Sequence, residues 1–341
     1  MKQRNANYDL MRCLAMIMVI MVHVPSKPFS GHPVLSNAFL VLIFTCNSLF
    51  YMLSGVLNLS KTFDKKEDYL LYYKKKTVEI VLPYVVFTLL LTLWGFVRVR
   101  KSFTLGSFLG EFYRDIMGEN ASGHLWFMYA LMGMLLAAPF LAKMLQSLSD
   151  WALKLLLGLA IGWNIVGIYL TTDFGVTFAY TNWFLYGWII HFVSGYAVYR
   201  LIPVDKEPKK LYIAAVAGFI LNTACMCLFS DNFQYSTDLS PLFLVWGMGA
   251  WAFLARHPRI RNPRVAHVLQ RIAKYSYLVY LVHFNVLYDI ILPRIPSVPT
   301  AAGSFIFYTL ATLFVSLFGC FFFDLLLISP AQRMLRKIMK I

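Results

Sequence analysis

Three residues near the N-terminus could do chemistry together: Asp9, Arg12 and His23, within the apolar run DLMRCLAMIMVIMVH. On an α-helix, the eleven residues from Arg12 to His23 span about 16 Å and close to three turns, so both side chains lie on one face. Histidine is the usual general base near neutral pH, and arginine presents a planar donor fork to phosphate or carbonyl groups. Asp9 precedes Arg12 by three residues and can pair with it. The alternative is that Arg12 reaches to the membrane surface and His23 only anchors the helix end.

The composition indicates that this run belongs to a membrane protein. Of the 341 residues, 59% are hydrophobic and 14% are charged, and the mean hydropathy is +0.63. Soluble proteins average about 45–50% apolar and about 25% charged residues. The net charge of +15 comes from short clusters between apolar runs, a pattern typical of cytoplasmic loops rather than of a nucleic-acid site. We therefore expect no nucleic-acid partner, and the five cysteines show no metal-ligand spacing, so no metal is expected.

The apolar segments predict an all-α integral membrane protein, a bundle of about ten transmembrane helices in one polytopic domain over residues 1–341. A spanning helix needs about 20 residues. The ten candidates are residues 8–24, 36–59, 78–97, 124–145, 151–170, 182–201, 211–229, 240–254, 272–292 and 303–329. With the N-terminus in the cytoplasm, 25 of the 31 Lys and Arg residues fall on the cytoplasmic side. This asymmetry predicts that the N- and C-termini are both cytoplasmic.

Two predicted outer loops differ from the cytoplasmic ones. Residues 171–181 and 230–239 contain no lysine or arginine and are rich in Thr, Asp, Ser and Tyr. Such loops suit an uncharged polyhydroxyl acceptor such as a sugar, although any solvated loop has a similar composition.

Five short motifs occur in order along the chain. The first is the Arg12–His23 pair, with ten residues between them and Asp9 before them. The others are FYMLSGVL at 50–57, the basic run Lys74–Lys76 followed by Leu-Pro-Tyr at 82–84, HLWF at 124–127 and SYLVYLVH at 276–283. Each motif alone is weak, whereas five in this order are specific, and together they resemble the motifs of the acyltransferase 3 family of integral membrane acyltransferases.

The resemblance implies a bacterial multi-pass protein of the inner (plasma) membrane. It would move an acyl group, most often acetyl, from cytoplasmic acyl-CoA to a hydroxyl of a cell-surface glycan or lipid-linked sugar. Acetyl-CoA or another short acyl-CoA would be the co-substrate, and Asp9, Arg12 and His23 would be the catalytic residues. The resemblance also points to a second set of residues that would bind donor or acceptor: Lys74, Lys75, Lys76, Ser54, His124, Trp126, Tyr280 and His283.

Each member of this second set has an ordinary structural alternative. The three lysines could be a plain cytoplasmic cluster, and Ser54 an interhelical hydrogen-bond partner. His124 and Trp126 could form an aromatic pair at the membrane interface. His283 could be a buried histidine satisfied by a tyrosine hydroxyl. One departure also concerns the donor: where the family usually has an arginine before Pro-Tyr, this chain has Glu79, so the lysines would have to compensate.

We expect His23 to take the proton of the acceptor hydroxyl while that oxygen attacks the thioester, with Arg12 orienting the donor. Direct transfer is favoured over a covalent serine intermediate because no G-x-S-x-G elbow is present. The alternatives are a transporter of a lipid-linked sugar or small solute, and a structural membrane protein. Against the transporter, the sequence shows no pair of predicted helices interrupted by Gly or Pro in corresponding halves. A structural role leaves the Arg12–His23 pair unexplained.

Overall fold

The fold is that of a helical membrane protein. A computed structural model describes residues 5–29, 31–99, 103–118, 123–173, 185–229, 239–295 and 299–341, and every element in these ranges is a helix. Within these ranges, eight helices are long and apolar enough to cross a membrane. Two further predicted spans are shorter, since α8 (Trp188–Leu201) has 14 residues and α11 (Pro241–Arg256) has 16. The all-α membrane class is confirmed, while the count of ten and the side of the termini stay predictions.

The remaining elements follow the predicted order, with longer or additional helices. They are α1 (Ala6–His23), α2 (Pro33–Leu59), α3 (Lys66–Lys76), η1 (Thr77–Val81), α4 (Leu82–Val99), α5 (Leu105–Met117), α6 (Trp126–Ser147), α7 (Asp150–Asp173), α9 (Lys209–Leu228), α12 (Pro263–Lys274), α13 (Ser276–Asn285), η3 (Val286–Ile291), α14 (Leu292–Arg294), α15 (Ala301–Phe323), η4 (Asp324–Ile328) and α16 (Ser329–Met339). Most of the two polar loops predicted at 171–181 and 230–239 lies outside the described residues.

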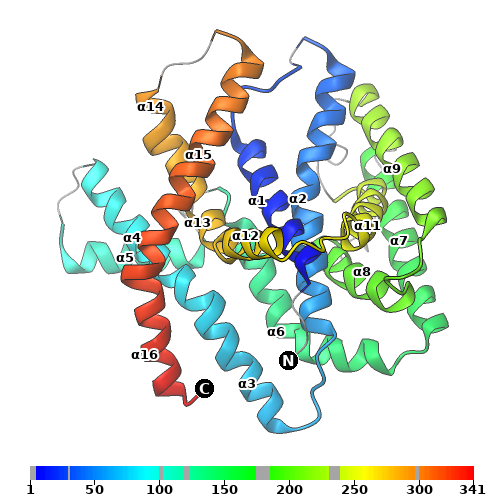
Figure 1. Ribbon diagram of the computed structural model, residues 1–341, viewed down its shortest axis with the longest axis horizontal. Helices are drawn as coiled ribbons and strands as arrows, with labels where there is room; N and C mark the ends of the chain where they lie inside the picture. Colours follow the sequence, from blue (N-terminus) through cyan, green and yellow to red (C-terminus); the bar gives the residue numbers. More distant parts are fainter. Residues whose placement is uncertain are drawn as a thin grey trace.

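Helix α2 is the centre of the bundle and packs against α1, α6, α8, α9 and α11 (Figure 1). Its closest neighbour is α8, and two glycines allow that approach. A Cβ on Gly55 would lie 1.8 Å from the Phe192 carbonyl oxygen, and a Cβ on Gly195 would lie 2.2 Å from the Met52 carbonyl oxygen. Only hydrogen side chains fit at these two positions, so the glycines set the α2–α8 distance.

In the described part of the chain, three helical segments contain π-helical turns, which insert an extra residue and free a backbone carbonyl. The turn η1 interrupts the helix formed by α3 and α4, η3 follows α13, and η4 joins α15 to α16. Within η1, the Ile80 carbonyl accepts a hydrogen bond from the Tyr277 hydroxyl of α13 at 2.8 Å. This bond ties α13 to the α3–α4 helix.

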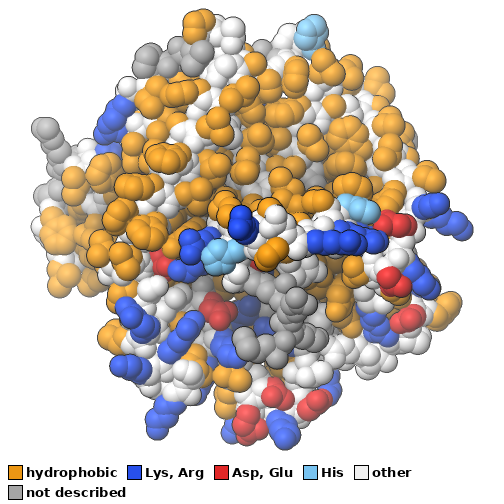
Figure 2. All heavy atoms as spheres, viewed as in Figure 1, with side chains coloured by type: hydrophobic (Ala, Val, Ile, Leu, Met, Phe, Trp, Pro, Cys, Tyr) orange, Lys and Arg blue, Asp and Glu red, His pale blue; other side chains and the backbone are white. Residues whose placement is uncertain are grey.

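The surface divides into an apolar and a charged region. Figure 2 shows hydrophobic side chains covering the upper part of one face, with lysines, arginines and acidic residues across its middle and lower part. Helix α12 crosses the front of the molecule near the boundary between these regions (Figure 1). The predicted ninth span begins too early, because Ile272 belongs to α12 and the next helix begins at Ser276.

Candidate active site

Helix α1 carries all three residues of the N-terminal pattern. It begins after Asn5, whose side chain accepts a hydrogen bond from the Asn7 amide, and it continues without a break to His23. The Arg12 guanidinium lies 3.0 Å from the Asp9 carboxylate, and the Asp9 side chain is only 2% exposed while that of Arg12 is 27% exposed. The predicted pairing is therefore confirmed, and it holds Arg12 with part of its side chain accessible.

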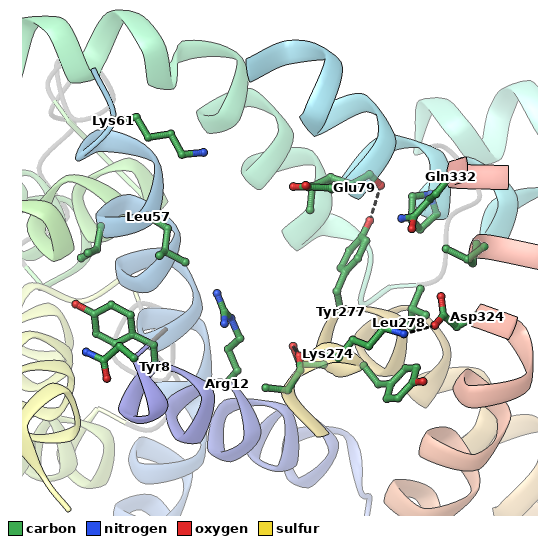
Figure 3. Close-up of a pocket in the computed structure, with 18 of the residues that line it drawn as sticks. Tyr8, Arg12, Leu57, Lys61, Glu79, Lys274, Tyr277, Leu278, Asp324 and Gln332 are labelled. Carbon is green, nitrogen blue, oxygen red and sulfur yellow. Dashed lines mark hydrogen bonds and ion pairs between the residues drawn. The ribbon is translucent and has the colours of Figure 1, made fainter. Parts of the chain in front are cut away.

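The accessible side of Arg12 faces a cavity of about 1190 Å³. Figure 3 shows Arg12 and Lys61 reaching into this first cavity, with Tyr8 near Arg12 and Glu79 and Gln332 on the opposite wall. Pockets for drug-sized ligands measure about 300–1,000 Å³. The first cavity is thus large enough for a ligand of greater size.

A second cavity of about 410 Å³ continues from the first. The two share Arg12, Lys61 and Tyr277 in their walls, so they adjoin around Arg12. The second cavity extends inward to Phe127 and Tyr280. Together the two form a path from Arg12 toward the interior of the bundle.

The walls of the two cavities carry more positive than negative charge. Their described basic residues number five and their acidic residues two, namely Arg12, Lys61, Lys76, Lys274 and Arg336 against Glu79 and Asp324. The Lys274 ammonium is paired with Asp324 at 2.6 Å. Such a surface attracts anionic ligands.

The three candidate lysines of the basic run separate in space. Lys76 lines the second cavity. Lys74 donates to the Met339 carbonyl at the end of α16, Lys75 is exposed, and neither belongs to the wall of the two cavities. Lys61 stands beside Lys76, since both ammonium groups lie over the Tyr72 ring, at 5.1 and 5.5 Å from its centroid.

Lys61 lies in the turn after α2, outside the membrane-spanning helices. Burial lowers the pKa of the Lys61 ammonium below its usual value, Glu79 opposes this effect, and Lys75 adds to it. An anionic ligand beside this ammonium would favour its charged form.

The C-terminal end of α1 meets a cluster of three histidines. The His23 ring centroid lies 5.2 Å from that of His283 and 6.3 Å from that of His124, and the last two are 5.1 Å apart. Phe284 packs against His23 and stacks on His124 at 5.3 and 5.1 Å. Tyr280, which lines the second cavity, lies 5.7 Å from His124 and 6.0 Å from His283. The inward path therefore ends beside the histidine cluster.

The hydrogen bonds of the cluster correct two structural alternatives. No tyrosine hydroxyl satisfies His283, because Tyr277, Tyr280 and Tyr288 each donate to a backbone carbonyl, those of Ile80, His124 and His23. His283 donates instead from Nδ1 to the Tyr280 carbonyl at 2.7 Å. Its Nε2 has no hydrogen-bond partner within the described part of the chain, and its side chain is fully buried.

His124 and Trp126 also do not form the interfacial pair considered above. His124 is 1% exposed and donates from Nε2 to the Leu281 carbonyl at 3.1 Å. Trp126 packs against Trp188 of α8, with ring centroids 4.9 Å apart, and lies outside the histidine cluster. Ser54 lines the second cavity, and its carbonyl accepts a hydrogen bond from the Asn58 side chain.

Comparison with known proteins identifies the family. The sequence model of a family described as an acyltransferase domain, acyltransferase 3, matches residues 5–325, nearly the whole chain. The chain belongs to the acyltransferase 3 family. No curated protein and no solved structure gives a match. The resemblance based on five short motifs is thus confirmed, and the protein is a multi-pass membrane acyltransferase.

In this acyltransferase 3 protein, Lys27 and Tyr288 fix the His23 end of α1. The Lys27 ammonium donates to the carbonyls of Met21, Val22 and Val24 at 2.6–2.8 Å, which are acceptors left open where the helix ends. The Tyr288 hydroxyl donates to the His23 carbonyl at 3.0 Å. Burial lowers the pKa of Lys27, in the loop after α1, to about 8.

Several residues of the acyltransferase site could not be found from the sequence. The charge pattern of the sequence places Lys61 and Arg336 on the cytoplasmic side and Lys27 on the outer side, and it gives them no further role. Arg336 reaches the cavity wall because α16 continues the helix of α15 and η4 past it, more than 300 residues after Arg12. No spacing in the sequence indicates such a contact. For Lys61, the only available signal was its place directly after a predicted span.

Proposed function

We propose that this acyltransferase moves a short acyl group, most often acetyl, from acyl-CoA to a hydroxyl of a cell-surface glycan or lipid-linked sugar. We place it in the bacterial plasma membrane. The observation that carries the proposal is the continuous path from the cation-lined first cavity, past Arg12, to Tyr280 beside the histidine cluster. An acyl-CoA combines an anionic nucleotide with a long thin arm that ends in a thioester. The large cation-lined cavity suits the nucleotide, and the smaller cavity that extends to Tyr280 suits the arm.

In the proposed arrangement, the nucleotide phosphates lie in the first cavity near Lys61 and Arg336. The pantetheine arm passes Arg12 and Lys76 into the second cavity, and the thioester comes to rest near Tyr280. Glu79 lines both cavities and reduces their positive charge. We infer that the arm, rather than a phosphate group, passes Glu79, because a carboxylate repels phosphate.

The chemistry assigned to the histidine cluster is general base catalysis. The acceptor oxygen attacks the thioester carbonyl, and His23 takes the hydroxyl proton as the new C–O bond forms. The C–S bond then breaks, and His23 returns its proton to the departing thiolate. His283 is fixed by its Nδ1–H bond to Tyr280, so its open Nε2 can accept a hydrogen bond from His23 and orient that ring.

Thermal unfolding of the detergent-solubilised protein with and without acetyl-CoA tests the donor assignment. A ligand that binds only the folded state stabilises it by about 2.7 kcal/mol at one hundred times its Kd. We expect acetyl-CoA to raise the unfolding temperature of the wild type and to leave that of Arg12→Ala unchanged. Arg261→Ala is the matched control, because Arg261 is exposed and lies outside both cavity walls. No shift with any acyl-CoA in the wild type would contradict the proposal.

A further inference from the structure

Helix α12 reaches the wall of the first cavity only through its last two residues, Ala273 and Lys274. The residues before them are segregated into three faces. One face packs against α1, where the Cys13 thiol donates to the Leu269 carbonyl at 3.7 Å. A second face is apolar but uncovered, since Val265 and Val268 are 46% and 55% exposed. A globular surface seldom keeps adjacent branched apolar side chains in water, whereas a lipid boundary accepts them.

The third face of α12 is cationic. Arg264, His267 and Arg271 are exposed and follow one another at helical spacings of three and four residues. The helix contains no acidic residue, and no carboxylate of the described residues forms an ion pair with Arg264 or Arg271. None of the three lines either cavity of the candidate active site. An anionic donor in those cavities would therefore leave this face uncompensated.

The position of α12 adds an independent observation. It crosses the front of the bundle, at a large angle to α15, at the level where the apolar surface gives way to the charged one (Figures 1 and 2). Directly after it, Tyr275 interrupts the helix and α13 begins. A helix in this place would have Val265 and Val268 toward the acyl chains and its arginines at the depth of the headgroups.

We propose that α12 lies in the membrane–water interface and that its cationic face binds the headgroups of anionic phospholipids. Each lysine or arginine near an anionic membrane surface contributes about 1 kcal/mol of binding free energy. Two arginines therefore contribute about a 30-fold increase in affinity for an anionic lipid. The exposed valines provide the second part of the site, because a phospholipid brings acyl chains together with its phosphate. The inference does not depend on the acyl donor or acceptor.

Lipid binding to the detergent-solubilised full-length protein, followed by native mass spectrometry, tests this assignment. We expect phosphatidylglycerol to bind more tightly than phosphatidylcholine, and Arg264→Gln/Arg271→Gln to weaken phosphatidylglycerol binding about 30-fold. The control Lys65→Gln/Lys66→Gln removes two exposed charges from the start of α3, far below α12 in Figure 1, and it should change binding less than threefold.

Two outcomes would overturn the inference. One is an equal loss of phosphatidylglycerol binding in the α12 variant and in the control, which would show a general effect of net charge. The other is displacement of the lipid by glycerol phosphate at similar concentrations, which would make the face a site for soluble phosphates. In the same α12 variant, acetyl-CoA should still raise the unfolding temperature. This measurement separates a failure of the lipid-binding inference from a failure of the donor assignment.

Discussion

At the scale of single residues, His23 differs from the other histidines in having its helix end fixed by two partners. Lys27 and Tyr288 bond the carbonyls of the last turn of α1, which holds the His23 ring beside His283 and His124. A general base depends on such positioning, because proton transfer requires hydrogen-bond distance to the substrate. Lys27 bonds backbone carbonyls, which every residue type provides, so no residue pattern in the sequence indicates its role.

His23→Ala is expected to lower acyl transfer by about 10²–10⁴-fold, the usual contribution of a general base, while the folded protein still binds its donor. The measurement is transfer of radiolabelled acetyl groups in membranes, together with the acetyl-CoA shift of the unfolding temperature. His32→Ala, in an exposed position before α2, should retain full transfer. Wild-type rates in His23→Ala would remove the base assignment, and a lost thermal shift would instead place His23 in donor binding.

Lys61 allows a prediction of pH dependence. Burial lowers the pKa of its ammonium, so Lys61 loses its charge at a lower pH than a solvated lysine. Donor affinity should therefore be full below the lowered pKa and should fall as pH rises through it. Lys61→Arg keeps the charge at alkaline pH and should make the affinity less dependent on pH, whereas Lys75→Arg should not. An unchanged alkaline profile in Lys61→Arg would exclude contact between Lys61 and the donor.

At the scale of elements, the α2–α8 contact leaves no room for a side chain larger than hydrogen at two glycines. Gly195→Ala would place a methyl group 2.2 Å from a backbone oxygen of α2. Unlike a side chain, the helix backbone cannot relieve this clash by changing rotamer. We expect a loss of at least about 2 kcal/mol in unfolding free energy. Gly158→Ala, in an α7 position with no atom within 4 Å of the new Cβ, should be neutral or stabilising by up to about 1 kcal/mol. The measurement is thermal unfolding of the two variants beside the wild type. Equal stability of Gly195→Ala and Gly158→Ala would show that α2 and α8 can move apart without cost.

The elements also show what a sequence pattern can and cannot predict. Long apolar runs predicted the helices because spanning length and hydropathy are local properties. The π-turn at Thr77–Val81 and the interfacial helix Pro263–Lys274 were missed. The π-turn contacts a residue almost 200 positions away, because the Tyr277 hydroxyl donates to its Ile80 carbonyl, and no local pattern indicates such a contact. The interfacial helix is short and strongly basic, so a search for apolar segments passes over it and extends the next span backward.

At the scale of the whole molecule, the family could be predicted because five short motifs follow one another along the chain, and the Asp9–Arg12 pair because both residues lie within one helix. The histidine cluster could be suspected only from the resemblance, because it joins residues from three distant segments. The cavities could not be predicted at all. Their walls combine α1, α2, the α3–α4 helix, α13 and α16, and only the folded arrangement brings these together.

The orientation of the molecule decides whether acyl-CoA can reach the site. The first cavity is lined by Asn5 and Arg336, so it lies beside both ends of the described chain. The charge asymmetry predicts that these ends face the cytoplasm, where acyl-CoA is made. We therefore expect a green fluorescent protein fused after Ile341 to fluoresce and alkaline phosphatase fused there to be inactive.

Alkaline phosphatase inserted after His32, in the loop between α1 and α2, provides the opposite control and should be active, because α1 crosses the membrane once before it. Active phosphatase at the C-terminus together with inactive enzyme at His32 would invert the molecule. The cavity would then open away from the cytoplasmic acyl-CoA, and Arg12 and Lys61 would need a different anionic ligand. The expected result is an active phosphatase after His32 and an inactive one after Ile341. It would place the cation-lined cavity on the cytoplasmic side, where the donor is made, and His23, at the other end of α1, toward the side where a surface glycan is found.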